Sequence, residues 1–347
     1  MEEGKGNKRI WKISLVIFVL CCIIFVLTIP KVNTKEEVVK KIKIGITGYD
    51  KNDTFVSFIM KGIETEAASY SSLNKGSNPV TVNIVYAEKN QMKQNAQVEK
   101  FISLGYDIIC VNLVDRTSAS EIVDKVETAG IPLIFFNREP VEDDIYRGEK
   151  VYYVGTDAKE TARLQGMLIA DKYHEDPLQI DKNGNGIIEY VMLEGESGHQ
   201  DAFIRTEYSI KVLKEQGISV EKLDSGTANW DRSEAAAMMT SWIETYGDSI
   251  ELVICNNDDM ALGVIDVFKS GNIKDVKVVG IDGTDPALNE VKYGYMLGTV
   301  SCESNLQGQA IFKLAVDLIN NHTPSEELIN EGERYIRVDL KTIKSDK

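Results

Sequence analysis

Strand-like and helical segments alternate with little interruption from Lys41 onward, and this pattern constrains the fold more than any other feature of the sequence. The first strand-like run is KIKIGITG (residues 41–48), and TFVSFIMKGIETEAASY, which has helical spacing, follows it. Further strand-like runs such as YDIICVNLV, IPLIFFN, IELVICNND and VKVVGIDG are separated by helical stretches. This alternation predicts parallel sheets covered by helices on both faces. Because the runs are too many for one twisted sheet, we expect two α/β lobes.

Charge and cysteine content narrow the possible functions. A formal net charge of -15 at pH 7 argues against a nucleic-acid partner, because the phosphates would be repelled. Cys21 and Cys22 lie in an apolar N-terminal run, whereas Cys110, Cys255 and Cys302 stand far apart. Since no CxxC spacing occurs, these cysteines indicate neither a zinc site nor a redox motif.

The N-terminal segment predicts export from the cytoplasm. Several lysines and an arginine precede the uncharged run ISLVIFVLCCIIFVLTI (residues 13–29). A basic flank before an apolar run is typical of a segment that leaves its basic side in the cytosol. We expect residues 1–37 to form an uncleaved anchor that holds the protein at the outer face of the cytoplasmic membrane. Cleaved secretion and lipidation at Cys21 or Cys22 are the alternatives.

The residues at the ends of the strands predict the site, because ligands of open α/β sheets bind beyond the carboxyl ends of the strands. These ends are residues 49–55, Asn137, residues 196–205, 230–231 and 257–258, Asp282 and residues 302–303. They are rich in amides, carboxylates and aromatic rings and poor in pairs of a nucleophile and a base. This chemistry suits holding a polyol rather than cleaving it.

Motifs in these segments resemble those of the type I periplasmic binding proteins, and within them the galactose/glucose-binding branch. The motifs are YDKNDTF, FFNREP, YYVGTD, GESGHQDAFIRT, NWD, CNNDDMALG and VVGIDGTDPAL. The resemblance runs from about residue 41 to the C-terminus. It implies two doubly wound parallel-sheet lobes joined by a three-strand hinge, which close over a monosaccharide and present it to an ABC transporter.

The resemblance also implies that each lobe is assembled from two segments of the chain. We expect residues 38–156 and 304–331 to form the N-terminal lobe. Residues 157–303 and 332–347 would form the C-terminal lobe. The hinge strands would then cross near residues 154–156, 302–304 and 331–335.

Carried over position by position, the resemblance implies sugar-binding side chains from both lobes. They are Asp53, Phe55, Asn137, His199, Asp201, Arg205, Trp230, Asn257 and Asp282. Phe55 and Trp230 would pack on the two faces of a pyranose ring, and the polar groups would bind its rim hydroxyls. Asp258 is expected to cap the following helix. Cys302 stands where the sugar-binding relatives have an asparagine, so it is expected at the cleft rim beside Asp282 and leaves the preferred hexose open.

Residues 181–189, DKNGNGIIE, have the spacing of a calcium loop, with oxygen ligands at alternate positions and a glycine sixth. Position 12 of that loop is Met192, which cannot supply the bidentate carboxylate. Taken alone, the segment could equally be an Asn/Gly-rich turn. The resemblance implies that Glu251, distant in sequence, completes the site. The predicted ligands of a structural Ca²⁺ are Asp181, Asn183, Asn185, Ile187 (carbonyl), Glu189 and Glu251.

Several functions are compatible with these features. We expect a non-enzymatic sugar receptor for an ABC importer. The alternative is a membrane-anchored sensing ectodomain that signals through a partner histidine kinase or chemoreceptor. A related sugar-responsive repressor is not expected, since no helix-turn-helix pattern is found. Asp53, Glu196, His199 and Asp201 could act as acid and base in glycoside hydrolysis. Each of them has a simpler hydrogen-bonding role, so we expect no catalysis.

Overall fold

The computed structural model describes residue 11 and residues 41–73, 79–322, 324 and 334–345. The predicted signal or anchor at residues 13–29 lies outside the described residues. No helix of the described part is both long enough and apolar enough to cross a bilayer.

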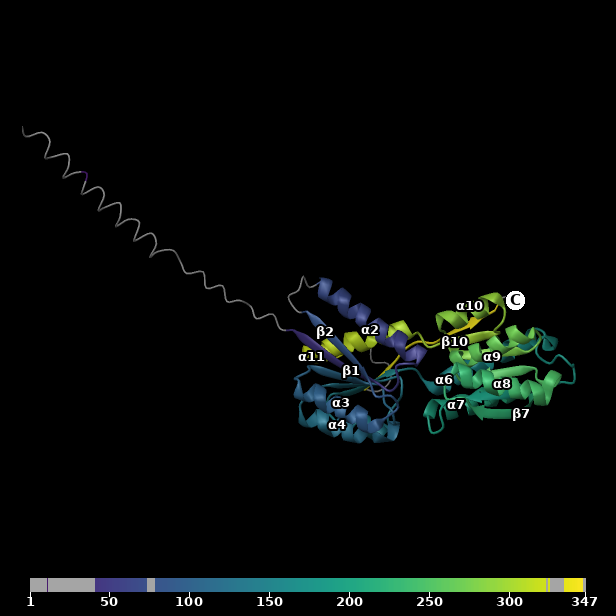
Figure 1. Ribbon diagram of the computed structural model, residues 1–347, viewed down its shortest axis with the longest axis horizontal. Coiled ribbons are helices and arrows are strands. Elements are labelled where there is room, and N and C mark those ends of the chain that lie inside the picture. Colours follow the sequence, from purple (N-terminus) through teal and green to yellow (C-terminus); the bar gives the residue numbers. More distant parts are fainter. Residues whose placement is uncertain (1–10, 12–40, 74–78, 323, 325–333, 346–347) are drawn as a thin grey trace, which may run out of the picture. The chain divides into compact units, whose positions relative to one another are not determined.

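The N-terminal lobe is built on a six-stranded parallel sheet with the order β11-β5-β4-β3-β1-β2 (Figure 1). Its strands are β1 (Ile42–Gly48), β2 (Val80–Tyr86), β3 (Ile108–Val111), β4 (Leu133–Phe136), β5 (Val151–Gly155) and β11 (Tyr335–Arg337). Its helices are α2 (Thr54–Leu73), α3 (Gln91–Ser103), α4 (Ala119–Thr128), α5 (Glu142–Ile145) and α11 (Ser304–Ile319), with a short 3₁₀ turn η1 (Arg116–Ser118). The chain leaves β1 toward β2 on one side and continues with β3 on the other, so the strand order reverses next to β1.

The C-terminal lobe repeats this plan with the order β12-β10-β9-β8-β6-β7. Its strands are β6 (Ile187–Glu194), β7 (Ser219–Thr227), β8 (Leu252–Cys255), β9 (Lys277–Asp282), β10 (Gly298–Ser301) and β12 (Lys341–Lys344). Its helices are α6 (Ala158–Glu175), α7 (Gln200–Glu215), α8 (Arg232–Tyr246), α9 (Asp258–Gly271) and α10 (Asp285–Tyr293), with 3₁₀ turns η2 (Pro177–Gln179) and η3 (Gly247–Ser249). Only β12 among the described strands of this sheet runs antiparallel, on the edge beside β10.

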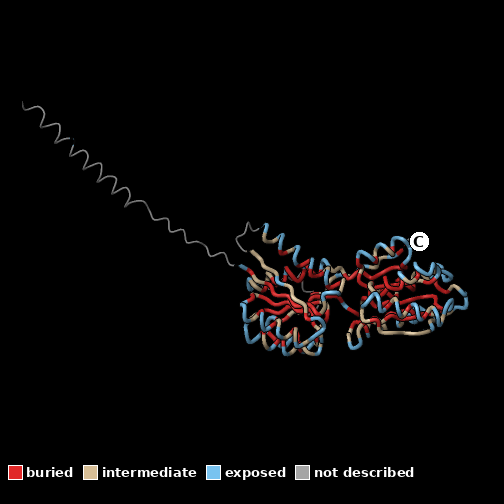
Figure 2. Tube along the Cα trace, in the orientation of Figure 1, coloured by how far each residue is buried: buried red, intermediate tan, exposed pale blue. Residues whose placement is uncertain are grey.

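Alternating side chains of the strands fill two cores in each lobe, as expected for a sheet with helices on both faces. In β3, Ile108 and Cys110 pack toward α2 and α11, whereas Ile109 and Val111 pack toward α3 and α4. The sheet of the C-terminal lobe is likewise buried on both faces. Figure 2 shows these buried strands inside each lobe, with exposed residues on the outer helices. The predicted fold class is confirmed.

Three segments connect the lobes. The first follows β5 and leads into α6, and the second leads from β10 into α11, close to the expected positions. The third differs from the expectation. Residues 335–337 form β11 and pair with β5 in the N-terminal lobe, although residues 332–347 were assigned to the C-terminal lobe. The crossing therefore falls between β11 and β12, at residues 338–340, because only β12 joins the second sheet.

Candidate ligand-binding site

The carboxyl ends of the two sheets face a common cavity. Its lining residues are Asp53, Phe55, Asn137, Arg138, His199, Asp201, Arg205, Trp230, Asn257 and Asp282. The structure thus brings together all the side chains predicted to bind the ligand except Cys302, and it adds Arg138. The cavity encloses about 30 Å³, which is room for roughly two or three water molecules.

Asp53 joins the cavity to the start of α2. One carboxylate oxygen accepts the backbone N–H of Val56 at 2.8 Å, which caps the helix. The other oxygen accepts the hydroxyl of Tyr49 at 2.6 Å. Phe55 lies in the first turn of the same helix and is largely buried. The helix start therefore sets the positions of both side chains.

Asn137 and Arg138 follow the end of β4. Asn137 has a left-handed backbone, with φ of 61°, and its backbone N–H donates to the carbonyl of Val154 at 3.1 Å. Its side-chain oxygen accepts the amide of Asn112 at 3.0 Å. Arg138 was not predicted to bind ligand, although it lies inside the motif FFNREP. Its place directly after Asn137 at a strand end is the signal that would have found it.

Arg205 is the buried cation of the C-terminal wall. One guanidinium nitrogen lies 3.3 Å from Asp201 and another lies 3.9 Å from Asp282. The carbonyl of Asn256 accepts a further hydrogen bond at 2.9 Å. The Nε atom of Arg205 is buried and has no hydrogen-bond partner in the described part of the chain. A buried donor without a partner is costly, so this atom favours a ligand that brings an acceptor oxygen.

His199 is held as a neutral imidazole. Its burial, reinforced by Arg138 and Arg205, lowers its pKa well below the usual range. Its Nδ1 atom accepts the backbone N–H of Asp201 at 3.1 Å, so the proton is assigned to Nε2. The ring meets Trp230 edge-to-face, with centroids 5.1 Å apart. His199 therefore offers a donor beside an aromatic face.

Trp230 reaches the cavity because of the backbone at Gly195. A Cβ atom at Gly195 would lie 2.1 Å from the Trp230 ring, so only glycine lets the indole pack there. Trp230 itself has a left-handed φ of 65°. The guanidinium carbon of Arg205 lies 5.9 Å from its ring. The indole is thus fixed by its neighbours before any ligand binds.

The helix-capping assignment at the start of α9 needs correction. Asn257, not Asp258, caps the helix, and its side-chain oxygen accepts the N–H of Met260 at 3.0 Å. The Asn257 amide nitrogen donates no hydrogen bond within the described residues, and the side chain still lines the cavity. Asp258 is fully buried and accepts hydrogen bonds from Thr284 and Thr299 instead. These hydrogen bonds connect Asp258 to the segments after β9 and in β10, behind the site.

Cys302 lies beside Asp282 as expected, since its backbone N–H donates to the Asp282 carbonyl at 2.9 Å, but its side chain is placed differently. Its side chain is 1% exposed and belongs to the core beside β1 and α11, and it does not line the cavity. Its sulfur lies 3.9 Å from the carbonyl of Val300. The residue follows β10 at the crossing into α11, where the chain turns inward to the core. The thiol therefore does not reach the cleft rim in this structure.

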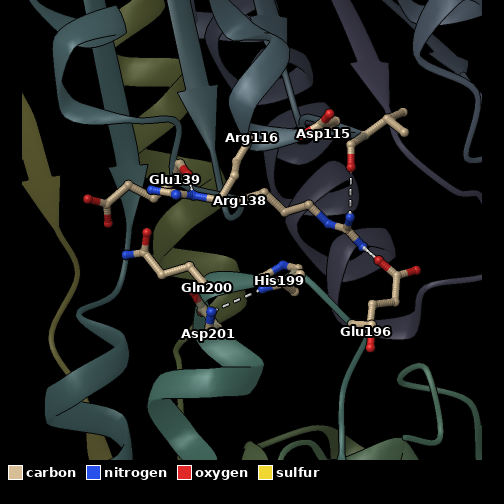
Figure 3. A pocket seen from close by; sticks show the side chains of 11 residues that line it. Asp115, Arg116, Arg138, Glu139, Glu196, His199, Gln200 and Asp201 are labelled. Atoms are coloured by element: carbon tan, nitrogen blue, oxygen red, sulfur yellow. Dashed lines mark hydrogen bonds and ion pairs between the residues drawn. The ribbon is translucent and has the colours of Figure 1, made fainter.

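A larger cavity of about 330 Å³ adjoins the first one and shares Arg138, His199 and Asp201 with it. Arg116, Glu139, Glu196 and Gln200 also line it (Figure 3). Arg116 donates to the carbonyls of Glu139 and Pro140 at 3.0 and 3.3 Å. In Figure 3 the long side chain of Arg138 extends across this space and ends at Glu196.

The model of the family described as "Periplasmic binding protein domain" matches residues 44–323. The chain belongs to this family. Its members bind substrates for transporters, so the protein is a binding protein and not an enzyme, and membership places it outside the cytoplasm.

Individual relatives in this family cover most of the chain. The D-galactose/methyl-galactoside binding periplasmic protein MglB of Haemophilus influenzae is 35% identical over 285 residues, which are 82% of this chain and 83% of that protein. The ribose import binding protein RbsB of Bacillus subtilis is 25% identical over 281 residues, covering 81% and 83%. An ABC transporter solute binding protein from Bacillus halodurans, solved with bound myo-inositol, is 31% identical with a TM-score of 0.70, covering 88% and 95%.

Carboxylate and amide side chains gather at the loop of residues 181–189. Asp181 is buried, and its carboxylate accepts the backbone N–H groups of Gly184 and Gly186 at 2.8 and 2.9 Å. Both oxygens of Glu251 accept backbone N–H groups of the loop, from Asn183 and Glu189, at 3.2 Å each. Among the described residues, no three His, Cys, Asp or Glu side chains are close enough together to hold a metal ion. The predicted ligands therefore gather at one loop without converging on one point.

The buried carboxyl of Asp258 generates a pH prediction. Burial raises the pKa of Asp258 to about 6, above the value of roughly 4 in an unfolded chain. The native state therefore holds a proton that the unfolded state releases, and the stability from this proton is lost as pH rises from about 4 to about 6. In Asp258→Asn this loss is absent. We therefore compare the free energies of unfolding of the two proteins. The wild-type value minus the Asp258→Asn value should fall by on the order of 2–3 kcal/mol as pH rises through this range.

Denaturant unfolding at several pH values measures this difference. Asp266, in the same helix, is the control, because its hydrogen bond to Arg232 lowers its pKa. For Asp266→Asn the corresponding difference should instead rise with pH in the acid range. A difference that does not change with pH for Asp258→Asn would contradict a raised pKa at this position.

Proposed function

We propose that the protein binds a neutral monosaccharide of the galactose/glucose class between its lobes and delivers it unchanged to an ABC importer. The observation that supports this most is the single cavity in which Phe55 and Trp230 meet planar polar groups from both lobes. A pyranose has apolar faces and a rim of hydroxyls, and this lining matches both.

The polar groups are suited to hydroxyls because both donors and acceptors are present. Asp53 and Asp282 supply acceptors. The donors are the Asn257 amide and Arg205 Nε, which has no hydrogen-bond partner among the described residues. Burial raises the pKa of Asp282 well above its usual range, which makes hydrogen-bond donors from a ligand favourable there. An analogue lacking one hydroxyl would leave one of these buried groups unpaired, so such a site discriminates strongly among sugars.

The relatives support the sugar class and the transport role. The Haemophilus protein is named for D-galactose and methyl-galactoside, the Bacillus subtilis protein for ribose import, and the Bacillus halodurans structure contains myo-inositol, a cyclic polyol. The relative named for galactose has the higher identity, which favours a hexose over a pentose. None of these relatives is named as a sensor, so we do not propose the sensing alternative.

Binding of a monosaccharide is tested by thermal shift and calorimetry with residues 38–347. D-galactose, D-glucose, D-ribose and myo-inositol are compared, and at least one hexose should raise the melting temperature with one-to-one stoichiometry. Trp230→Ala should weaken binding of that hexose by about 1–3 kcal/mol through loss of an aromatic face. Phe203→Ala is the control, since Phe203 is an exposed aromatic residue outside the cavity. If no sugar binds, or if recovered sugar is chemically changed, the proposal is wrong.

We also propose that the loop at residues 181–189 binds a structural Ca²⁺ together with Glu251. The donors are all oxygen atoms, which suits calcium. Burial and the adjacent Glu189 raise the pKa of Glu251 to about 6, as expected for two carboxylates that face each other without a cation. The side-chain amides of Asn183 and Asn185 now donate to Glu189 at 3.1 and 2.8 Å. A rotation of these amides would present their oxygens to the ion. The bound ion would neutralise the carboxylates and tie the loop to the start of β8.

Removal of calcium tests this second proposal. A chelator should lower the melting temperature of the wild type, because an ion bound only by the folded state stabilises it by mass action. Glu251→Gln should remove most of the chelator's effect. Sugar affinity should change little, because none of the loop residues lines the ligand cavity. A melting temperature that is the same with chelator and with millimolar calcium would show that the loop is only a turn.

We propose from the sequence alone that residues 13–29 hold the protein at the outer face of the membrane. Their uncharged apolar run behind a basic flank supports this. After expression of residues 1–347, the protein should sediment with membranes and resist extraction by high salt. Residues 38–347 should stay in the soluble fraction. Recovery of a shortened, soluble product from the full chain would favour cleavage instead.

A further inference from the structure

We propose that Glu196 and Arg138 form a latch across the cleft that slows escape of the bound ligand, although Glu196 does not line the ligand cavity. This inference rests on the proposed function, because it concerns retention of the same sugar. It assigns to Glu196 a positioning role that the sugar contacts do not require.

The latch pairs groups that belong to different lobes. Arg138 follows β4 in the N-terminal lobe, and Glu196 follows β6 in the C-terminal lobe. A guanidinium nitrogen of Arg138 lies 2.7 Å from Oε2 of Glu196 (Figure 3). The ammonium of Lys89, also from the N-terminal lobe, lies 3.3 Å from Oε1. Both carboxylate oxygens therefore face cations of the opposite lobe. In the described part of the chain, Glu196 has no ion pair within its own lobe.

Arg138 is held in place before the lobes meet. Its guanidinium lies 3.5 Å from the centroid of the Tyr49 ring, a stacked arrangement. A second guanidinium nitrogen donates to the carbonyl of Val114 at 3.1 Å. These contacts all lie in the N-terminal lobe. Because the long side chain is already ordered, less conformational entropy is lost when Glu196 arrives.

The latch is connected to the ligand cavity through Tyr49. The ring of Tyr49 supports Arg138, and its hydroxyl donates to Asp53 at 2.6 Å. Asp53 and Arg138 both line the ligand cavity. A ligand that orders Asp53 also steadies Tyr49 and the guanidinium above it. Tyr49 thus connects Asp53, which lines the ligand cavity, to Arg138, which makes the lobe-to-lobe contact.

The location of the pair determines which rate it affects. The Arg138 and Glu196 side chains are 7% and 20% exposed, so the pair is largely shielded from solvent when the walls are together. Separation of the lobes rehydrates both groups, and its cost is part of the barrier to ligand release. Loss of a short-range pair of this kind increases dissociation more than it slows association.

Glu196→Gln tests the latch, because the variant keeps the shape of the side chain and removes its charge. With the best-binding neutral sugar of the thermal-shift screen, stopped-flow of tryptophan fluorescence should give dissociation about 5- to 30-fold faster. The association rate should change less than threefold. Glu160→Gln is the matched control, since Glu160 pairs with Arg163 at 2.7 Å inside α6 and does not cross the cleft. Its kinetics should equal those of the wild type.

Ionic strength provides a readout that a merely structural role would not give. Release of a neutral sugar from the wild type should accelerate as salt rises from about 20 mM to about 500 mM, because salt screens the attraction between the two groups once the separating lobes expose them to solvent. Release from Glu196→Gln should respond much less. The melting temperature without sugar should be the same for both proteins.

Two outcomes separate this inference from the proposed function. If the wild type binds no sugar, the proposed function itself fails. If the wild type binds sugar but Glu196→Gln releases it at the wild-type rate with the same salt response, the latch is refuted and the function stands. A lower melting temperature of ligand-free Glu196→Gln, in step with its weaker binding, would instead assign Glu196 a role within its own lobe.

Discussion

The buried guanidinium of Arg205 is the group on which the arrangement of the site depends. A charge of this kind is strongly unfavourable away from water unless hydrogen bonds and opposite charges surround it. Asp201 lies one turn before it in α7, Asp282 ends β9, and the carbonyl of Asn256 follows β8. Two strand ends and one helix must therefore meet at a single point. The parallel sheet, whose carboxyl ends share one edge, provides that meeting point.

Backbone conformation shows a related constraint at the carboxyl ends of both sheets. Asn137, Trp230 and Asp282 all line the cavity and all have positive φ, at 61°, 65° and 133°. Such conformations cost free energy for residues other than glycine, so they persist only where the surrounding structure holds them. Here the abrupt ends of buried strands turn side chains back toward the opposite lobe. The strain is therefore associated with aiming these groups into the cavity.

Much of this arrangement could be predicted, because strand ends in a parallel sheet follow directly from the alternating sequence pattern. That pattern indicates which residues share an edge of one sheet. Asp53 and Trp230 follow strands of different sheets, so only the family resemblance implied that they meet. The pattern could not indicate which of two adjacent polar residues faces a helix end. For this reason the helix cap was assigned to Asp258, whereas Asn257 forms it and also lines the cavity. Cys302 and the third crossing were misplaced because a crossing strand can turn toward either lobe, and only packing decides.

The division of charge between the two walls explains how a neutral ligand can be held by charged side chains. The C-terminal wall carries the carboxyl groups of Asp201 and Asp282 against Arg205, and Glu196 adds a negative charge at its rim. The N-terminal wall presents Arg138 and Lys89 to Glu196. Opposite charges at the rim thus favour approach of the lobes without a charge on the ligand. The hydroxyls of the ligand need only satisfy the buried donors and acceptors that remain inside. Attraction between the walls and selection of the ligand are in this way assigned to different side chains, with Arg138 and Tyr49 connecting them.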